Sequence, residues 1–384
     1  MNPNLFQPPF SPEYGTPPGS TLREVLERLG LSQSELAERT GRPKKTINEI
    51  VQGKAAITAE TALQLERVLN IPASFWNNLE RSYRAAQARQ DERAELAPYV
   101  QWLDTLPVKE IVKRGWIRHH KDQIEQIREV LTFFGVALPS AWDEVWAEAR
   151  KATALRQGQS RQVDFGTVAV WLRKGEIEGR KCSCDPYVED KFRDALAYLR
   201  SLTTLDPRKF CSEIVARCAA SGVAVVFVPE LPRLRIFGAA RWLSSDRALI
   251  QLSLYYKRED QLWFSFFHEA AHILLHGRRD IFIDLDTNDP DKQEVEANRF
   301  ASDYLIPAGP YAQFVARRNW SASAVQQFAK KVGISSGIVV GRLQHDKHIE
   351  FNQLTRLRRP IDWSVVAEAK AAAGSTASSV LPSR

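Results

Sequence analysis

Residues 261–276 combine an apolar helical pattern with ionisable side chains, and this combination restricts the fold more than any other stretch of the sequence. The run QLWFSFFHEAAHILLH contains neither glycine nor proline, so it predicts a buried helix. His268 and His272 are four residues apart and therefore share one face of that helix, with Glu269 beside the first of them. A buried helix has little reason to carry these groups unless they bind a ligand.

Two imidazoles at this spacing with an adjacent carboxylate indicate a zinc hydrolase. A catalytic zinc takes a third protein ligand and keeps one position for water. His276 continues the same helical face, but it lies two turns from His268, too far to share an ion at bond lengths of about 2 Å. A metzincin pattern needs a glycine and a further histidine, and no histidine follows Gly277 closely enough.

Residues 294–307 predict a second amphipathic helix, which ends at a proline. Glu294 is the better candidate for the third ligand, and Glu296, which points to another face, is the second candidate. Asn298 shares a face with Glu294 and can hold a ligand histidine through its distal ring nitrogen. The acidic loop before this helix predicts a solvated surface that could favour basic peptides. It contains Asp280, Asp284, Asp286, Asp289 and Asp291.

The segments HEAAHILLH and EVEANRFASDYLIP resemble the ImmA/IrrE family of metallopeptidases, and the likeness covers roughly residues 186–346. The resemblance implies a zincin-like domain of the gluzincin type with one Zn2+ per chain. The implied zinc ligands are His268, His272 and Glu294, with Glu269 as the general base. The resemblance also implies an endopeptidase that cuts repressor-like regulators of transcription. Spacing does not identify the donor that stabilises the oxyanion, for which the candidates are Tyr304, His345 and His348.

Five short helical patterns follow one another between residues 20 and 83, separated by turns of two to five residues. The second pattern opens at Ser32 and has Glu35 three residues later, which predicts a capping box. Gly41 ends this helix, and Pro43 stands where the third one begins. Two short helices joined in this way are typical of a helix-turn-helix, whose second helix enters the major groove of DNA.

The third helical pattern leaves polar side chains outward near its start. Lys44 or Lys45 can donate to guanine or phosphate, and Asn48 can pair with adenine. Residues at the start of the second helix and after the third are better placed for phosphates, which fix the register without reading sequence. The predicted DNA contacts are Ser32, Gln33, Lys44, Lys45, Thr46, Asn48 and Lys54.

The segments GLSQSELA, TINEIVQGKAAIT and FWNNL resemble the Cro/C1 helix-turn-helix family, and within it the HigA-type antitoxins. The likeness covers about residues 16–84 and departs from the family at Pro43, where a Ser or Thr cap is usual. The resemblance implies a double-stranded DNA operator, bound by a homodimer on two half-sites. A toxin partner is a further candidate that this resemblance raises.

The charge balance agrees with an anionic partner such as nucleic acid, because the formal net charge is +7 and the isoelectric point is near 9.2. No apolar stretch is long enough to span a bilayer, and the first residues lack the pattern of a secretory signal. We therefore expect a cytoplasmic protein without a membrane partner. The cysteine spacings match neither a disulfide framework nor a common structural zinc module, which predicts reduced thiols at Cys182, Cys184, Cys211 and Cys218.

The predicted fold is multidomain and begins with an all-α helix-turn-helix bundle. A helical connector and an α+β zincin-like domain with a helical C-terminal part follow. Short β-branched runs predict strands at residues 223–228, 238–243 and 248–253. The predicted boundaries are a flexible arm (1–15), the helix-turn-helix domain (16–90), the connector (91–185), the metallopeptidase domain (186–358) and a flexible tail (359–384).

Two hypotheses follow from these motifs. The first is a transcriptional regulator that binds an operator and carries a zinc endopeptidase, whose target is a partner regulator or the chain itself. The alternative is a non-catalytic HigA-like antitoxin or repressor, in which the zinc domain is a sensor or a structural module. A secreted type of protease is disfavoured by the missing signal and by the DNA-binding motif.

Overall fold

The computed structural model describes residues 16–156, 164–278, 280–285 and 291–368. The chain divides into two compact units, residues 1–100 and residues 101–384. The predicted flexible arm and residues 369–384 of the predicted tail lie outside the described residues. Within the described ranges, no helix has both the length and the apolarity that a membrane span requires.

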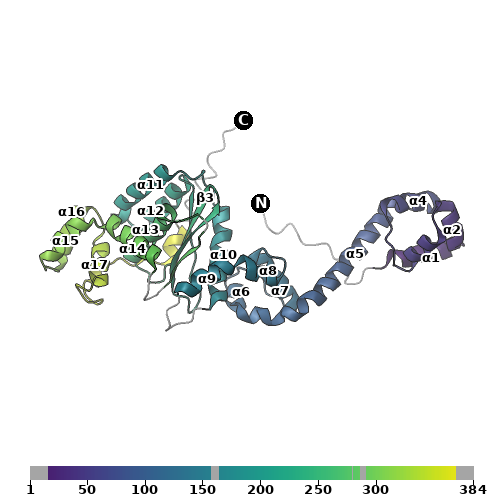
Figure 1. The fold of residues 1–384 in the computed structure, drawn as a ribbon, viewed down its shortest axis with the longest axis horizontal. Helices are drawn as coiled ribbons and strands as arrows, with labels where there is room; N and C mark the ends of the chain where they lie inside the picture. The colour runs from purple at the N-terminus through teal and green to yellow at the C-terminus, as the bar shows by residue number, and fades with distance from the viewer. Residues whose placement is uncertain (1–15, 157–163, 279, 286–290, 369–384) are drawn as a thin grey trace, which may run out of the picture. The chain divides into compact units, whose positions relative to one another are not determined.

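The described part of the first unit is helical (Figure 1). Its helices are α1 (Pro18–Leu29), α2 (Gln33–Thr40), α3 (Lys44–Val51), α4 (Ala59–Leu69) and α5 (Ala73–Leu96). The predicted capping box is confirmed, because Glu35 N donates to Ser32 Oγ at 3.2 Å and Ser32 N donates to Glu35 Oε2 at 2.8 Å. Gly41 then ends α2 in the left-handed conformation, with φ 67°, and the chain turns into α3.

The core of the first unit takes one large apolar side chain from each helix. Each of these five side chains has 0% exposure: Leu22, Leu36, Ile47, Leu65 and Trp76. Burying one such side chain contributes about 1.5–3 kcal/mol, so they hold the short helices together. Gly19 lets α1 pack closely on α3, because a Cβ at this position would overlap with the backbone oxygen of Ile50.

Four strands in the described part of the second unit form a mixed sheet. They are β1 (Val223–Phe227), β2 (Ile236–Ser244), β3 (Arg247–Leu252) and β4 (Phe282–Leu285), in the order β1-β3-β2-β4. β1 pairs with β3 in parallel, and β2 pairs antiparallel with both β3 and β4. The three predicted strands are confirmed. β4 is an addition that lies in the segment predicted to be an acidic loop.

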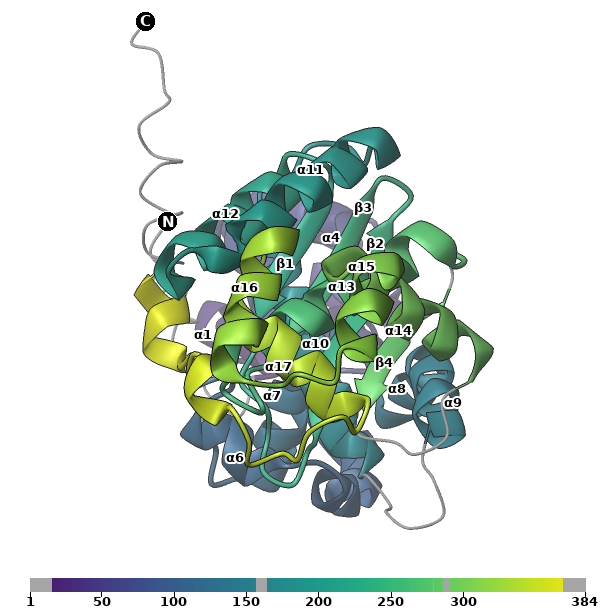
Figure 2. The same ribbon diagram turned by 90° about the vertical axis from the view of Figure 1, so that its left-hand side faces the viewer.

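Helices cover both faces of this sheet, because its strands point apolar side chains to both sides (Figures 1 and 2). In β1, Val223, Val225 and Phe227 belong to one buried cluster, whereas Ala224 and Val226 belong to the other. The first cluster takes in α11 (Glu189–Ser201), α12 (Pro207–Ala219), α13 (Glu259–Leu275), α14 (Lys292–Leu305), α15 (Ala308–Ala316), α16 (Ala322–Val332) and α17 (Ser336–His345).

The second cluster takes in the helices of the predicted connector. The segment after α5 contains the 3-10 helix η2 (Ala97–Thr105), α6 (Val108–Lys113), α7 (Gln123–Phe134), α8 (Pro139–Val145), α9 (Ala147–Arg156) and α10 (Phe165–Lys181). Trp171 of α10 is fully buried, and its Nε1 donates to Val228 O at 3.1 Å. The described helices within residues 101–185 therefore form a layer of the second unit and cover one face of the sheet.

Two segments differ from the sequence-based expectations. The sequence predicts a turn-rich patch from Arg173 to Pro186, but this segment is helical as far as Lys181, and Gly175 and Gly179 let α10 approach the side chains of β3. Residues 359–368, placed in the predicted tail, include the buried side chains of Ile361 and Val366 and a helical turn. This segment follows the 3-10 helix η4 (Thr355–Leu357), and Ile361 N donates to Lys257 O at 3.0 Å. All four cysteines are free thiols.

Candidate functional site

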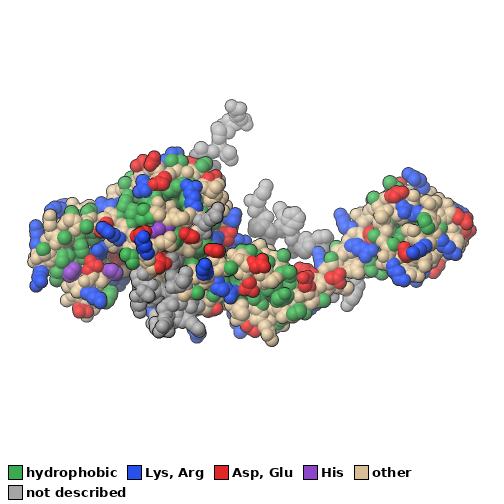
Figure 3. Space-filling view, viewed as in Figure 1, with side chains coloured by type: hydrophobic (Ala, Val, Ile, Leu, Met, Phe, Trp, Pro, Cys, Tyr) green, Lys and Arg blue, Asp and Glu red, His purple; other side chains and the backbone are tan. Residues whose placement is uncertain are grey.

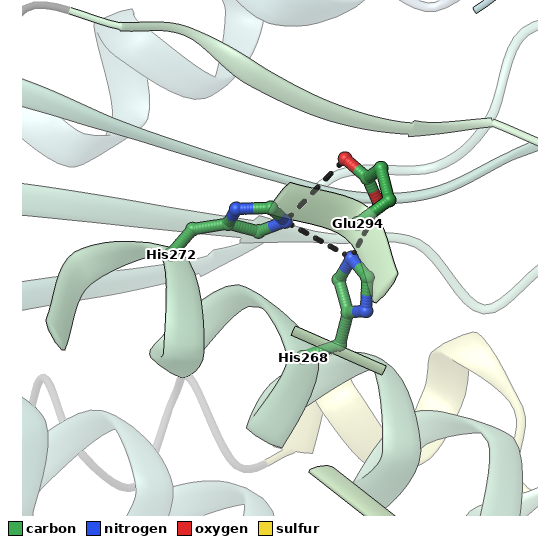
Figure 4. Close-up of side chains that lie close together, drawn as sticks. All are labelled: His268, His272 and Glu294. Carbon is green, nitrogen blue, oxygen red and sulfur yellow. Dashed lines mark hydrogen bonds and ion pairs between the residues drawn. The ribbon is translucent and has the colours of Figure 1, made fainter. Parts of the chain in front are cut away.

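Three buried side chains from two helices converge in the second unit (Figure 4). His268 and His272 lie one turn apart on α13, and their Nε2 atoms are 3.1 Å apart. Glu294 is in the first turn of α14, which Asp291 caps, and its Oε2 lies 3.0 Å from His268 Nε2 while its Oε1 lies 3.5 Å from His272 Nε2. Exposure is 1% for each histidine and 7% for Glu294. These three side chains, called the metal cluster below, are therefore shielded from solvent.

The geometry and chemistry of the metal cluster fit Zn2+. Two imidazole nitrogens and a carboxylate are a donor set that zinc uses in hydrolases. Ligands of a tetrahedral zinc at bond lengths of 2.0–2.1 Å are separated by about 3.3 Å. The two imidazole nitrogens are 3.1 Å apart and lie 3.0 and 3.5 Å from different carboxylate oxygens of Glu294, and these separations bracket this value. His268, His272 and Glu294 therefore could hold one zinc ion.

The surroundings of the two histidines favour the cationic form of His268 and the neutral form of His272. Burial lowers the pKa of His268, but Asp284 and Glu294 outweigh burial and raise this pKa to about 9. Burial lowers the pKa of His272 to about 4, and the charge on His268 acts in the same direction. Because two cationic rings this close repel each other, the second ring stays neutral and can donate its lone pair to a cation.

Asn298 contacts His268, the predicted zinc ligand, and Gly238 makes room for Glu269, the predicted general base. Asn298 Oδ1 lies 3.1 Å from His268 Nδ1 and can accept a hydrogen bond from the N–H group there, which leaves Nε2 for a metal. Glu269 is 0% exposed and lies beside the metal cluster. Gly238 of β2 makes room for it, because a Cβ at position 238 would overlap with the Glu269 carboxylate.

Asp284 is a neighbour of the metal cluster that the sequence did not identify. It lies on β4, and a carboxylate oxygen of Asp284 is within 4.8 Å of candidate ligand atoms of His268 and Glu269. The sequence placed it in a solvated loop, because five aspartates lie close together there. The one available signal was the apolar pattern of Phe282, Ile283 and Leu285 around it, which is short even for a strand.

The predicted alternatives for the third ligand, His276 and Glu296, contact each other. His276 ends α13, and its Nε2 lies 3.3 Å from Glu296 Oε2. Its Nδ1 lies 2.9 Å from His272 Nδ1. If His276 Nε2 donates a hydrogen bond to Glu296, His276 Nδ1 can accept one from the N–H group at His272 Nδ1. The lone pair of His272 Nε2 then faces Glu294.

The three candidates for oxyanion stabilisation have other contacts. The Tyr304 ring packs on Phe267 and stacks on Phe300. His345 is exposed, and its Nδ1 lies 2.9 Å from Asp346 Oδ1. His348 stacks on Trp320, with ring centroids 5.4 Å apart. None of these contacts assigns the role to one residue, so it stays a prediction.

The predicted DNA contacts on α3 are open to solvent in the first unit. Lys44, Lys45 and Asn48 are exposed, whereas Thr46 is half-buried. Lys45 Nζ lies 3.9 Å from Glu49 Oε1, an exposed pair that contributes little stability and leaves the ammonium free to turn to a ligand.

Other predicted DNA contacts flank α3. Ser32 is exposed but its hydroxyl is used in the capping box, Gln33 is half-buried, and Lys54 is exposed. Lysine and arginine side chains are spread over the visible face of α1–α5 (Figure 3).

Comparison with known proteins finds a family match in the N-terminal part of the chain and another in the C-terminal part. Residues 22–76 match the helix-turn-helix family. Virulence-associated protein I from Dichelobacter nodosus is 40% identical over 78 residues, which are 20% of this chain and 72% of that protein. The chain belongs to the helix-turn-helix family. Residues 238–344 match the IrrE N-terminal-like domain of the M78 peptidase family.

Two further similar proteins match the helix-turn-helix domain. The uncharacterized HTH-type transcriptional regulator YddM from Escherichia coli K12 is 32% identical over 73 residues, which are 19% of this chain and 78% of that protein. A solved addiction module antidote protein of the HigA family from Coxiella burnetii is 30% identical, with 22% of this chain and 91% of that chain covered and a TM-score of 0.21.

The predicted family resemblances are confirmed, with a helix-turn-helix domain at the N-terminus and an M78 domain at the C-terminus. The M78 match begins at Gly238, beside Glu269, and ends within α17. It therefore contains every residue of the metal cluster. The helix-turn-helix match contains α2 and α3, which carry the exposed basic side chains.

We predict that His276→Phe weakens zinc binding by the M78 domain about 10- to 100-fold. The phenyl ring fills the same buried space, since the His276 side chain is 4% exposed, but it removes the acceptor that orients His272. Competition with a chromophoric chelator measures the affinity. His276→Gln restores an acceptor and should recover part of it. An unchanged affinity in His276→Phe would show that His276 has no role in orienting His272.

Proposed function

We propose that this chain is a DNA-binding transcriptional regulator whose M78 domain is a zinc-dependent endopeptidase. The convergence of His268, His272 and Glu294 in one buried cluster beside Glu269 is the observation that carries the enzymatic half. The DNA-binding half is supported by the helix-turn-helix match and by the similarity to an HTH-type transcriptional regulator. Both halves are needed, because each match covers a different compact unit.

The metal cluster and two residues beside it, Asn298 and Glu269, have distinct roles in the proposed hydrolysis. A bound zinc would polarise a peptide carbonyl and lower the pKa of a water molecule. His268, His272 and Glu294 would hold the ion, and Asn298 keeps the His268 ring in the required orientation. Glu269 would act as general base, taking the proton from the attacking water and passing it to the leaving amine.

The proposed DNA recognition uses the exposed start of α3. Lys44 and Lys45 carry positive charge that can reach guanine or phosphate, and Asn48 has the amide that pairs with adenine. Asn48 Oδ1 accepts a hydrogen bond from Gln52 Nε2 at 3.2 Å, a contact between exposed groups that DNA can replace. A dimer on two half-sites is the expected binding form.

The proposed substrate is a repressor-like regulator, a partner or another copy of this chain. A chain that binds an operator raises the local concentration of its peptidase around other proteins bound to the same DNA. The test is to incubate the zinc-loaded chain with separately purified helix-turn-helix repressors and to analyse the products by mass spectrometry. We expect one pair of fragments that is absent after chelation. Intact repressors throughout would contradict the proposed substrate class.

A further inference from the structure

A pocket lies between α13, α14 and α17, three helices that lie together in both ribbon views (Figure 2). It encloses about 100 Å³, and its apolar wall is formed by Phe264, Leu305, Ile306 and Ile338. An engineered apolar cavity of roughly 150 Å³ in another protein binds benzene. The α13–α17 pocket is smaller than that cavity, so we match it to one branched aliphatic side chain rather than to an aromatic ring.

Residues that line the α13–α17 pocket lie one helical turn from residues of the metal cluster and its support. Phe264 precedes His268 by one turn of α13, and the two ring centroids are 6.2 Å apart. Ser302 lines the pocket and follows Asn298 by one turn of α14. Because an extended peptide advances about 3.3 Å per residue, a side chain one or two residues from a bond held at the metal cluster can enter the pocket.

The one carboxylate that lines the pocket is already neutralised. Asp260 is 4% exposed, and Arg358 Nε lies 3.1 Å from its Oδ1 and 3.0 Å from its Oδ2. The second nitrogen of the same guanidinium lies 2.7 Å from Asp260 Oδ2. A buried charge that is fully paired offers nothing to a ligand, so the interior selects by shape and apolarity.

Lysine and arginine side chains outnumber carboxylates in the described lining of the pocket and of the hollow beside it. Arg342 Nε donates to Asp346 Oδ2 at 2.7 Å, and that carboxylate also accepts from Tyr311 Oη at 2.8 Å. Lys257 and Arg258 line a neighbouring hollow, which has no acidic residue among its described lining and shares Gln261 with the pocket. Asp346 balances Arg342, so the excess positive charge beside the pocket comes from Lys257 and Arg258.

We propose that the α13–α17 pocket is a substrate subsite that binds a leucine or isoleucine side chain, with an acidic residue preferred beside it. The inference rests on the proposed peptidase function and specifies its substrate class. It also modifies the expectation from the acidic loop, which favoured basic peptides. On the α17 side of the metal cluster, the structure favours the opposite charge.

Binding of short fluorescent peptides to the zinc-loaded Glu269→Gln chain tests the subsite without cleavage. The probes are Gly-Gly-Leu-Asp-Gly-Gly and its variants with alanine in place of leucine or lysine in place of aspartate, measured by fluorescence anisotropy. We expect the alanine probe to bind at least about tenfold more weakly, since each missing methylene in a pocket costs roughly that factor. The lysine probe should bind about threefold more weakly, with a difference that shrinks as salt rises.

Three variants, each made in the Glu269→Gln chain, separate the two preferences. Ser302→Phe fills the pocket from α14 and should abolish the preference for leucine over alanine. Arg342→Gln should abolish the preference for aspartate over lysine and keep the preference for leucine. Lys330→Gln is the matched control, because it removes one positive charge from an exposed position on α16 outside the pocket and should change neither preference.

The outcomes distinguish the subsite from the peptidase. Failure of the leucine probe to bind, equal binding of the leucine and alanine probes, or an unchanged preference in Ser302→Phe would overturn the subsite. Cleavage of the same probes by the wild-type chain, read by mass spectrometry, checks the peptidase separately. Cleavage without a leucine preference contradicts the subsite alone. Selective binding without any cleavage of these probes or of purified repressors contradicts the peptidase and leaves the subsite standing.

Discussion

Glu269→Gln should abolish peptide-bond hydrolysis while leaving zinc and DNA binding intact. The amide has the same shape as the carboxylate but cannot accept a proton from water, and loss of a general base lowers the rate by about 10²- to 10⁴-fold. Glu269 is fully buried beside the metal cluster and is not one of the three proposed ligands, so its neutralisation leaves those ligands in place. Fragment formation from a purified repressor, zinc content and operator affinity are measured on the same preparation.

Glu350→Gln is the control for this substitution, because it makes the same chemical change at an exposed position. It should cut at the wild-type rate. If Glu269→Gln also cuts at the wild-type rate, Glu269 is not the general base. If neither the wild type nor any variant cuts while zinc is bound, the result favours the alternative of a non-catalytic regulator with a sensor or structural zinc domain.

The double variant Lys45→Ala with Asn48→Ala should lose most operator affinity. Lys45 is 85% exposed on its side chain, Asn48 is exposed on the same helix, and neither residue supports the core, so the fold should be unaffected. A bidentate base contact contributes roughly 1–3 kcal/mol, so we expect binding to fall by at least tenfold and the discrimination between sequences to relax. The operator is first selected from random duplexes with the wild-type chain, and affinities are then measured at fixed salt.

Arg67→Ala provides the comparison, since Arg67 is exposed on α4 and lies outside α2 and α3. It removes a positive charge from the same domain and should change operator affinity little. Equal affinities of the double variant and the wild type would contradict the named contacts, although the domain could still bind through other residues.

The convergence of His268, His272 and Glu294 could be predicted because the geometry within each helix is local, and their role as metal ligands stays a prediction. A spacing of four residues fixes His268 and His272 on one face of any helix, and the same rule places Glu294 and Asn298 on one face of the next helix. Only the meeting of the two helices had to be inferred. The structure brings the four side chains together at hydrogen-bond distances. His276 was excluded as a ligand by its distance of two turns from His268, and in the structure it follows the last residue of α13 with its Nδ1 2.9 Å from His272 Nδ1.

Asp284 and the α13–α17 pocket could not be predicted, because each depends on contacts between distant segments. Asp284 reaches the metal cluster through the pairing of β4 with β2, and a four-residue strand has almost no periodicity of its own. The pocket is formed by α13, α14 and α17, which are separated by long stretches of chain. The same limit explains residues 359–368, where Ile361 and Val366 look like isolated apolar residues until their packing is known.

The helices of residues 91–185 show what periodicity alone can and cannot provide. Helical patterns with Trp142 and Trp146 as anchors are visible in the sequence, and both side chains are 3% exposed. The partner that these helices bury is the far face of the sheet, which includes Ala224 and Val226. Because that partner follows later in the chain, the sequence indicated the helical connector but not its packing as a layer on the sheet.

Metal analysis of the full chain purified without chelator tests the central claim most directly, because every proposed catalytic role depends on the metal cluster. Elemental analysis should find about one zinc per chain in the wild type and almost none in His268→Ala. The substitution removes one of three protein ligands and leaves only two to hold the ion. Circular dichroism of both proteins checks that the helices persist. A folded wild type that contains no zinc, or a His268→Ala variant that retains one zinc per chain, would contradict the account.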